Sequence, residues 1–292
     1  MKNIRRICCV LSAVICIASA AQTTQAAEHT KAAPSFVMPN THMHTISTNK
    51  TINKDYLLYV HLPESYDASK TYPVLYLLDP WWDFPVVAGA HSGMVYDGVI
   101  PSMIIVGIGL ADLSADPNVL RNSDYTPTKT ALANTGDGKA FLNFISAKVI
   151  PFVESTYAVD KNFRVLAGTS YGGLFTLYTM FEKPGLFQGH IAISPAVVYD
   201  NNWLFQREAD FKNGKQTRQL NSHLYMAVGD KDPLPDFVKE IKAFNFVLEK
   251  SAHQKLNLKF EVRKNAYHAS VKLGAFSQGL MHAFSPYLKV QN

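Results

Sequence analysis

The sequence predicts an α/β protein in which a mostly parallel central sheet is covered by helices on both faces. Apolar runs of strand length alternate along the chain with segments of helical periodicity, which is typical of a parallel sheet built from strand–helix–strand units. The run SMIIVGIGL at residues 102–110 is apolar at nearly every position, as expected of a strand buried on both faces. No internal repeat, charge block or Ser/Gly/Pro-rich linker divides the chain, so residues 28–292 are predicted to form a single domain.

The expected elements follow from these patterns in chain order. Strands are expected at residues 55–63, 73–79, 102–110, 163–168, 189–194, 222–229 and 256–264, and helices at residues 138–157, 170–181, 235–250 and 271–288. Apolar residues recur at helical spacing in the first helix, from Phe141 to Phe152, and Pro151 is expected to kink it. Residues 111–135 show no periodicity, and a connection of this length is typical of a functional loop.

The composition excludes several classes of protein. The chain of 292 residues is 47% hydrophobic and only 17% charged, and it holds 17 Phe and 14 Tyr, which excludes a disordered chain. With 16 Gly and 3 Cys it is neither collagen-like nor a disulfide scaffold. The 28 Lys and Arg against 23 Asp and Glu form no basic cluster, so no nucleic-acid partner is predicted. The oligomeric state stays open.

Residues 1–27 have the pattern of a secretory signal peptide. Lys2, Arg5 and Arg6 form a positive start, and an apolar or small-residue run over residues 7–21 is followed by small residues that suit cleavage. This run is shorter than the roughly 20 residues that span a bilayer, so we expect removal of the leader and no membrane span. All three cysteines lie in it, which leaves the mature chain without a disulfide or a thiolate nucleophile. The predicted location is periplasmic or secreted.

A G-x-S-x-G motif at Gly168, Ser170 and Gly172 carries the clearest chemical signal in the chain. It stands directly between an apolar strand and an apolar helix, which is the context that a nucleophile elbow requires. In such an elbow the serine sits on a strained turn with its hydroxyl above the sheet, and the flanking glycines let the backbone fold tightly. We therefore predict that Ser170 is a nucleophile. The alternative is an ordinary Gly-rich junction between a strand and a helix.

An elbow serine needs a general base and an orienting carboxylate, which follow it in the order Ser, Asp or Glu, His. His268 closes the last predicted strand and is the predicted base, whereas His253 and His282 lie where structural or surface histidines are common. Asp230 and Asp232 follow the next-to-last strand, at the edge where open α/β sheets place ligands. We prefer Asp232, because the loop has turned away from the strand by then, and keep Asp230 as the alternative. The other aspartate is expected to serve the turn or cap the next helix.

His42 and His44 would lie on one face of a strand, as two metal ligands can. No third ligand is apparent, so a surface strand is the preferred interpretation and no metal site is predicted. The predicted chemistry needs no organic cofactor either.

Several segments together resemble one known family. They are YPVLYLLD, the loop RNSDYTP at residues 121–127, FLNFISAKVIPFVESTY, the elbow with the following ISP segment, and VGDKDP. Over residues 37–290 the chain resembles the esterase D-like (Putative esterase) family of α/β-hydrolases, most of all its branch of periplasmic siderophore (enterobactin-type) esterases. The resemblance implies an α/β-hydrolase fold with an eight-stranded sheet, no large separate lid domain, and hydrolysis of a small-molecule ester. It also implies Ser170 as nucleophile, Asp232 as acid and His268 as base.

The chain departs from that family directly after the strand YLLD. The family usually carries Gly there, whereas this chain continues with Pro80, Trp81 and Trp82. The backbone N–H of Tyr171 is expected to be one oxyanion donor. Pro80 has no N–H, so we assign the second donor to Trp81. Trp81 and Trp82 could instead form the wall of a pocket for the acyl or aryl group, or cap the core.

Arg121 is a candidate substrate-binding residue for an anionic ester, and the alternative is a structural ion pair with Asp124 or another carboxylate of its loop. The predicted function is an exported serine esterase that hydrolyses carboxylic esters, siderophore esters among them, through Ser170, His268 and Asp232 and an acyl-enzyme. The alternatives are an acyltransferase of the same fold and a non-catalytic ligand-binding module with a relict elbow.

Overall fold

The computed structural model describes residues 37–47, 54–112, 114, 116–214, 219–251, 253 and 255–291. The predicted signal peptide at residues 1–27 lies outside the described residues. Residues Pro39–Asn292 are one unit, which contains the sheet. Within the described ranges, no helix combines the length and the apolar character needed to cross a membrane.

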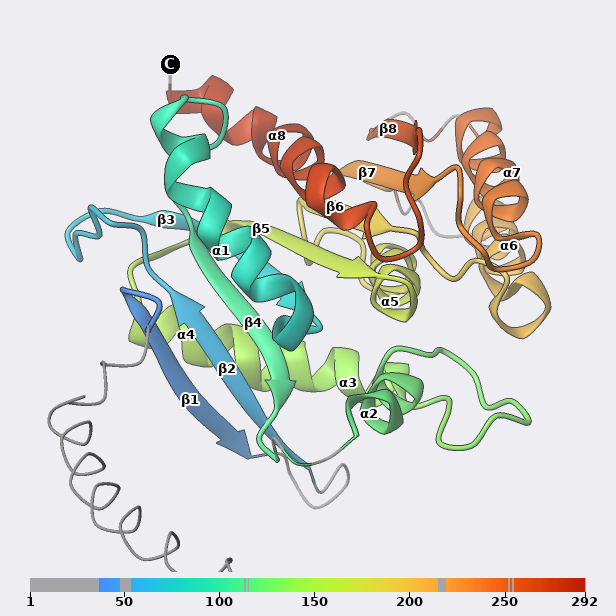
Figure 1. Ribbon diagram of the computed structural model, residues 1–292, viewed down its shortest axis with the longest axis horizontal. Helices are drawn as coiled ribbons and strands as arrows, with labels where there is room; N and C mark the ends of the chain where they lie inside the picture. Colours follow the sequence, from blue (N-terminus) through green and yellow to red (C-terminus); the bar gives the residue numbers. More distant parts are fainter. Residues whose placement is uncertain are drawn as a thin grey trace, which may run out of the picture. The chain divides into compact units, whose positions relative to one another are not determined.

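An eight-stranded sheet forms the centre of this unit (Figure 1). The strands are β1 (Thr41–Ser47), β2 (Asp55–His61), β3 (Tyr72–Leu78), β4 (Ile104–Leu110), β5 (Val159–Thr169), β6 (Gly189–Ile193), β7 (Ser222–Gly229) and β8 (Leu256–Arg263). Their order across the sheet is β1-β2-β4-β3-β5-β6-β7-β8. Only β2 runs antiparallel to its neighbours, β1 and β4, and every other pair is parallel. The mostly parallel sheet and its eight strands agree with the prediction.

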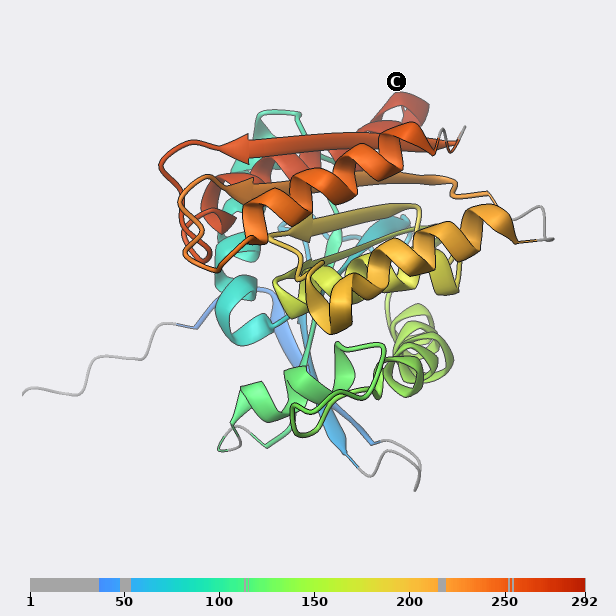
Figure 2. The same cartoon turned by 90° about the vertical axis from the view of Figure 1, so that its right-hand side faces the viewer.

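Helices cover both faces of the sheet, as predicted (Figures 1 and 2). They are α1 (Pro80–Tyr96), α2 (Pro117–Asp124), α3 (Gly138–Phe144), the π-helical segment η1 (Ile145–Val149), α4 (Ile150–Thr156), α5 (Tyr171–Glu182), α6 (Tyr199–Asn213), α7 (Phe237–Lys250) and α8 (Lys272–Gln291). The helices α1 and α8 pack on one face and on each other, while α4, α5 and α7 pack on the other face.

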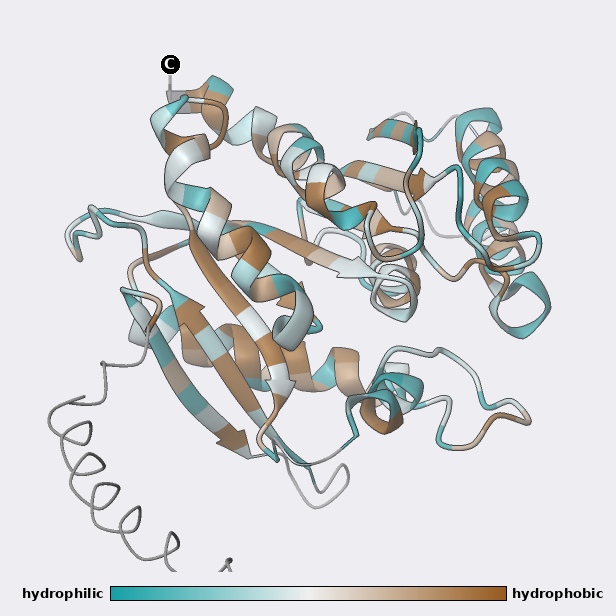
Figure 3. Ribbon diagram, viewed as in Figure 1, coloured by the Kyte–Doolittle hydropathy of each residue, from teal (hydrophilic) through white to brown (hydrophobic). Residues whose placement is uncertain are grey.

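The buried strands explain why the sheet lies at the centre. All seven residues of β3 are buried, as are six of the seven of β4, because helices cover both sides of these strands. In Figure 3 the strands β2 and β4 are largely brown, whereas the edge strand β1 alternates between teal and brown. Burial of each large apolar side chain contributes about 1.5–3 kcal/mol, so this layer is a main source of stability.

Three helices were not expected from the sequence: α1, α2 and α6. In α1, the polar residues Asp83 and His91 stand among the buried positions and interrupt the apolar stripe. In α6, Glu208 does the same. The helix α2 is only eight residues long, too short for a clear period, and it lies inside the connection at residues 111–135 that was expected to have no regular structure.

The predicted helix at residues 138–157 is interrupted just before Pro151, as expected of a proline within a helix. The interruption takes the form of the π-helical segment η1, which joins α3 to α4. Pro151 has no N–H to donate and its ring crowds the preceding turn, and a wider π turn relieves both problems.

The carboxyl ends of the parallel strands lie at one edge of the sheet. Asp79 follows β3 directly, Ser170 follows β5 directly, and Asp232 and His268 lie in the loops after β7 and β8. Open α/β sheets bind ligands at this edge. The topology therefore collects the residues singled out by the sequence in one region.

Candidate active site

Ser170 joins β5 to α5 in a strained turn. Its backbone angles are φ 59° and ψ −115°, a conformation that few residues other than glycine adopt. The Ser170 N–H donates to the Ile193 carbonyl of β6 at 2.9 Å, and the Ser170 carbonyl accepts from the N–H groups of Leu174 and Ala196 at 2.9 and 3.1 Å. These hydrogen bonds hold the turn from the sheet side and from the helix side.

Gly168 and Gly173, which lie on either side of Ser170, permit this turn. A Cβ atom on Gly168 would lie 2.5 Å from the carbonyl carbon and oxygen of Gly172, and a Cβ on Gly173 would lie 2.9 Å from the Pro195 Cα. These obstacles are backbone atoms or atoms tied to backbone, so they cannot move aside cheaply. The predicted elbow is therefore present with the backbone geometry that the motif implies.

His268 and Asp232 form a hydrogen-bonded pair. The His268 Nδ1 lies 2.7 Å from the Asp232 Oδ2. The Asp232 side chain is 0% exposed and that of His268 is 26% exposed, so the carboxylate is shielded while the ring reaches the surface. Because a carboxylate accepts this hydrogen bond, Nδ1 carries the hydrogen and the neutral ring keeps a lone pair on Nε2. Phe237 packs edge-on against the ring at 5.2 Å between centroids.

Asp230 occupies a different environment. Its side chain is exposed, and its backbone N–H donates to the Arg263 carbonyl at 3.0 Å. Asp230 lies in the turn that follows β7, which is one of the two roles expected of the other aspartate, and it does not cap α7, because the residue before that helix is Asp236. The loop runs on past Asp230 before α7 begins, and the Asp232 Oδ1 accepts from the Leu234 N–H at 3.2 Å within it.

A cavity of about 280 Å³ has Ser170 and His268 in its wall. The residues that line it are Asp79, Trp82, Arg121, Thr169, Ser170, His268, Ala269 and Lys272. The predicted nucleophile and the predicted base thus face one hollow, although they come from distant parts of the chain.

Arg121 lies at this cavity in an ion pair with Asp79. The Arg121 Nε is 2.8 Å from the Asp79 Oδ1, and its Nη2 donates to the Thr169 carbonyl at 3.4 Å. The alternative partner considered above, Asp124, instead accepts from Lys54 Nζ at 2.8 Å. Burial raises the pKa of Asp79 to about 6, and the guanidinium of Arg121 opposes that rise.

Lys272 and Asp83 are site residues that the sequence did not reveal. The Lys272 Nζ lies 2.7 Å from the Asp83 Oδ1, and the Asp83 Oδ2 accepts from the Thr169 Oγ1 at 3.1 Å. The pair joins residues 189 positions apart, so no local pattern could have predicted it. Trp82, 47% exposed, has the Arg121 Cζ and the Lys272 Nζ at 5.2 and 5.5 Å from its ring centroid.

The expected oxyanion donors are both amides of first helical turns. Tyr171 opens α5, and Trp81 is the second residue of α1. The amides of Trp82 and Asp83 both donate to the Asp79 carbonyl, and within the described residues no carbonyl accepts the N–H of Trp81. Of the two tryptophans expected at the pocket, Trp82 lines the cavity, whereas the indole Nε1 of Trp81 is buried and has no partner in the described part of the chain.

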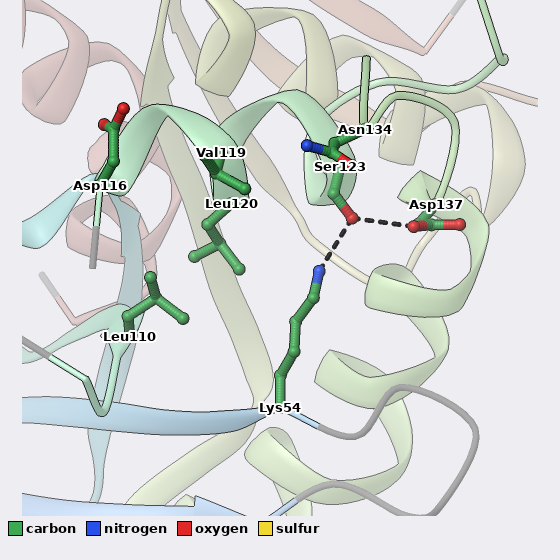
Figure 4. Close-up of a pocket in the computed structure, with 8 residues that line it drawn as sticks. All are labelled: Lys54, Leu110, Asp116, Val119, Leu120, Ser123, Asn134 and Asp137. Atoms are coloured by element: carbon green, nitrogen blue, oxygen red, sulfur yellow. Dashed lines mark hydrogen bonds between the residues drawn. The ribbon is translucent and has the colours of Figure 1, made fainter.

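A second cavity, of about 390 Å³, lies beside α2 (Figure 4). Its lining residues are Lys54, Leu110, Asp116, Val119, Leu120, Ser123, Asn134 and Asp137. The polar groups at its base are bound to one another: the Ser123 Oγ accepts from the Lys54 Nζ and donates to the Asp137 Oδ2, each at 2.8 Å. None of the predicted catalytic residues lines it, although α2 contributes Arg121 to the first cavity.

Three of the other histidines, His44, His253 and His282, have structural partners. His44, considered above as a metal ligand, has its Nε2 2.6 Å from the hydroxyl of Tyr157. The His253 Nε2 lies 3.0 Å from the Glu208 Oε1, and the His282 Nε2 binds a backbone carbonyl, as expected of structural histidines. Across the described ranges, no three His, Cys, Asp or Glu side chains converge as a metal site requires.

Comparison with known proteins identifies the family and the fold. The sequence model of the family described as "Putative esterase" matches residues 49–282. Ferri-bacillibactin esterase BesA of Bacillus subtilis (strain 168) is 28% identical over 272 residues, which cover 86% of this chain and 92% of that protein. The solved BES protein from Bacillus cereus superposes with a TM-score of 0.77 at 24% identity, over 86% of this chain and 98% of that one. An IroE-like serine hydrolase from Shewanella oneidensis gives a TM-score of 0.70 at 26% identity, over 85% and 81% of the two chains. The predicted α/β-hydrolase fold is confirmed, and the chain belongs to the Putative esterase family.

Proposed function

We propose that this chain is a serine ester hydrolase in which Ser170 is the nucleophile, His268 the general base and Asp232 the orienting acid. One observation carries the proposal. Ser170 and His268 line the same cavity, and the Asp232 Oδ2 holds the His268 Nδ1 at 2.7 Å. Membership in the esterase family and the likeness to a solved serine hydrolase support it.

The chemistry follows from these positions. The Ser170 Oγ attacks the ester carbonyl carbon while the His268 Nε2 takes the hydroxyl proton and later returns one to the leaving alcohol. Asp232 keeps the imidazole in the required tautomer and stabilises its charged form. The negative oxygen of the tetrahedral intermediate accepts hydrogen bonds from the backbone N–H groups of Tyr171 and Trp81. Water, deprotonated by His268, then attacks the acyl-enzyme and releases the acid and Ser170.

The cavity wall favours an ester with an aromatic or anionic group. Trp82 offers an exposed indole face, and Arg121 and Lys272, which pair with Asp79 and Asp83, bring charged hydrogen-bond donors to the same wall. One relative is named as a ferri-bacillibactin esterase and another, of Escherichia coli O6:H1, as an apo-salmochelin esterase. Siderophore esters are therefore the first natural substrates to test.

Export to the periplasm or medium is the proposed location. The positive start, apolar run and small residues of residues 1–27 support it. Expression of the full chain in a Gram-negative host, followed by fractionation and N-terminal sequencing, tests it. A processed periplasmic product is expected, and an unprocessed cytoplasmic product would contradict it.

Hydrolysis by the wild type and by Ser170→Ala tests the catalytic proposal. The substrates are short p-nitrophenyl esters and siderophore trilactones with and without iron. We expect Ser170→Ala to lose on the order of a thousandfold or more in kcat. The control is Ser155→Ala, because that serine is exposed on α4, before the start of β5, whereas Ser170 follows the end of β5. Retained activity in Ser170→Ala would contradict the mechanism, and transfer of the acyl group to an added alcohol in preference to water would indicate an acyltransferase.

A further inference from the structure

The carboxylate of Asp83 contacts both halves of the proposed catalytic pair through their sequence neighbours. Asp83 lies in the first turn of α1 and is 0% exposed. Its Oδ1 accepts from the Nζ of Lys272, which begins α8 four residues after His268. Its Oδ2 accepts from the Oγ1 of Thr169, which directly precedes Ser170. A single buried side chain therefore joins the serine turn to the histidine turn.

We propose that Asp83 is a positioning residue for the ester hydrolysis proposed above. Through Thr169 on one side and Lys272 on the other, it sets the separation and orientation of Ser170 and His268. The inference rests on the proposed function and adds to it roles for Asp83, Thr169 and Lys272 that the spacing of the G-x-S-x-G motif does not specify.

The other anchors of the two turns explain why such a bridge is needed. The serine turn is held by Ile193 on β6 and by Ala196 beyond it. The histidine turn is held to the loop after β7, where the Lys231 N–H donates to the Ala266 carbonyl at 3.0 Å and Asp232 binds the ring. Each of these contacts fixes one turn on its own neighbours, and none of them joins the two turns. Catalysis depends on their relative position to within a fraction of an ångström.

The surroundings of Asp83 suit a fixed bridge. Both carboxylate oxygens have partners, as a buried charge requires, and the first turn of a helix favours a negative group. Burial raises the pKa of Asp83, while the nearby ammonium of Lys272 acts in the opposite direction. The Lys272 side chain is only 17% exposed, so the ion pair is shielded from solvent and constrains geometry more than a surface pair would.

If Lys272 bound the substrate directly, the kinetic results expected of the variants would differ. Lys272 lines the cavity, so it could bind an anionic ester itself. In that case Lys272→Met would raise KM for anionic esters only, and loss of the Thr169 hydroxyl would change nothing. If Asp83 positions the pair, loss of either contact lowers kcat on a small neutral ester such as p-nitrophenyl acetate.

The test compares Thr169→Val, Thr169→Ser, Lys272→Met and the double variant Thr169→Val/Lys272→Met with the wild type on p-nitrophenyl acetate. Valine replaces the hydroxyl with a methyl group of similar size, and serine keeps the hydroxyl without the methyl. We expect Thr169→Val and Lys272→Met each to lower kcat by on the order of tenfold with KM changed by less than about twofold, and Thr169→Ser to regain most of the rate. Because both changes cut the same bridge, the double variant should be about as slow as the slower single variant.

Three outcomes overturn the proposal. A wild-type kcat in Thr169→Val contradicts the positioning role, and Lys272→Met serves the same purpose if the valine variant does not fold. In that case an inactive Ser170→Ala still supports the proposed hydrolase. Losses that multiply in the double variant show two independent roles. A wild-type protein that neither hydrolyses esters nor reacts with a fluorophosphonate removes the proposed function, and the positioning role with it.

Discussion

Replacement of Asp232 by asparagine tests the proposed mechanism at one atom. The Asp232 Oδ2 now accepts the hydrogen of the His268 Nδ1 at 2.7 Å. An asparagine amide presented there would donate instead, which forces the ring hydrogen onto Nε2. That nitrogen could then no longer take the proton of Ser170, so the base would be lost although the shape of the site is kept.

The expected loss can be worked out from the burial of the pair. In a Ser-His-Asp triad the corresponding change lowers kcat about 10⁴-fold, or about 5.4 kcal/mol of barrier. The Asp232 side chain is 0% exposed, so no solvent replaces it, but the His268 ring is 26% exposed and water can reach it. We therefore expect a loss between about 10³-fold and 10⁴-fold.

The assay is kcat on p-nitrophenyl acetate, with urea unfolding alongside. The change replaces a hydrogen bond to a charged group with one between neutral groups, so a destabilisation of about 1 kcal/mol is expected and must be separated from the kinetic effect. The matched control is Asp230→Asn, two residues away and exposed, which should keep activity within about twofold. More than a tenth of wild-type activity in Asp232→Asn, or an equal loss in Asp230→Asn, would refute the assignment of the acid.

Three further predictions concern the elbow, one buried histidine and the cavity wall. Gly168→Ala should prevent stable folding, because the added Cβ would lie 2.5 Å from the carbonyl of Gly172. In the control Gly89→Ala, on the exposed side of α1, the added Cβ meets no atom within 4 Å, so this variant should be more stable by up to about 1 kcal/mol. Urea unfolding measures both, and a normally folded Gly168→Ala would contradict the strained elbow. Burial lowers the pKa of His91 to about 4, so the unfolded chain binds more protons below pH 6.5 and stability falls as the pH falls from 6.5 toward 4. At pH 5 this cost is about 2 kcal/mol of unfolding free energy. Between pH 7 and pH 5 the unfolding free energy of His91→Gln should therefore fall by about 2 kcal/mol less than that of the wild type. An identical fall in both proteins would show that another group is responsible. Trp82→Ala should raise KM for aryl esters about tenfold with an unchanged urea midpoint, because the ring is 47% exposed; an unchanged KM would exclude Trp82 from the substrate site.

The sequence was informative wherever one local constraint decided the structure. The elbow could be recognised because Gly168 must lack a side chain for the turn to close, since its Cβ would lie 2.5 Å from the Gly172 carbonyl. The strand at residues 222–229 was placed at its observed bounds because it is apolar and ends in Gly-Asp. Chain order then selected His268, and the loop direction selected Asp232 over Asp230, which the hydrogen bond to the ring agrees with.

The features that the sequence did not predict depend on contacts between segments far apart in the chain. The helix α1 escaped prediction because Asp83 and His91 occupy core positions, and each is tolerated only through partners elsewhere in the chain. Likewise, Arg121 pairs with Asp79 after β3 and not with its neighbour Asp124, because the fold brings the end of β3 beside α2. Periodicity and motif spacing carry no information about such pairs.

Covalent labelling of the serine is the most direct test of the central claim. The wild type is treated with a fluorophosphonate, digested and mapped by mass spectrometry, with His268→Ala treated in parallel. The account predicts one adduct, on Ser170, formed at least a hundredfold more slowly in His268→Ala, on the order of the loss of a general base. An adduct on another serine, or an equal rate in both proteins, would contradict it.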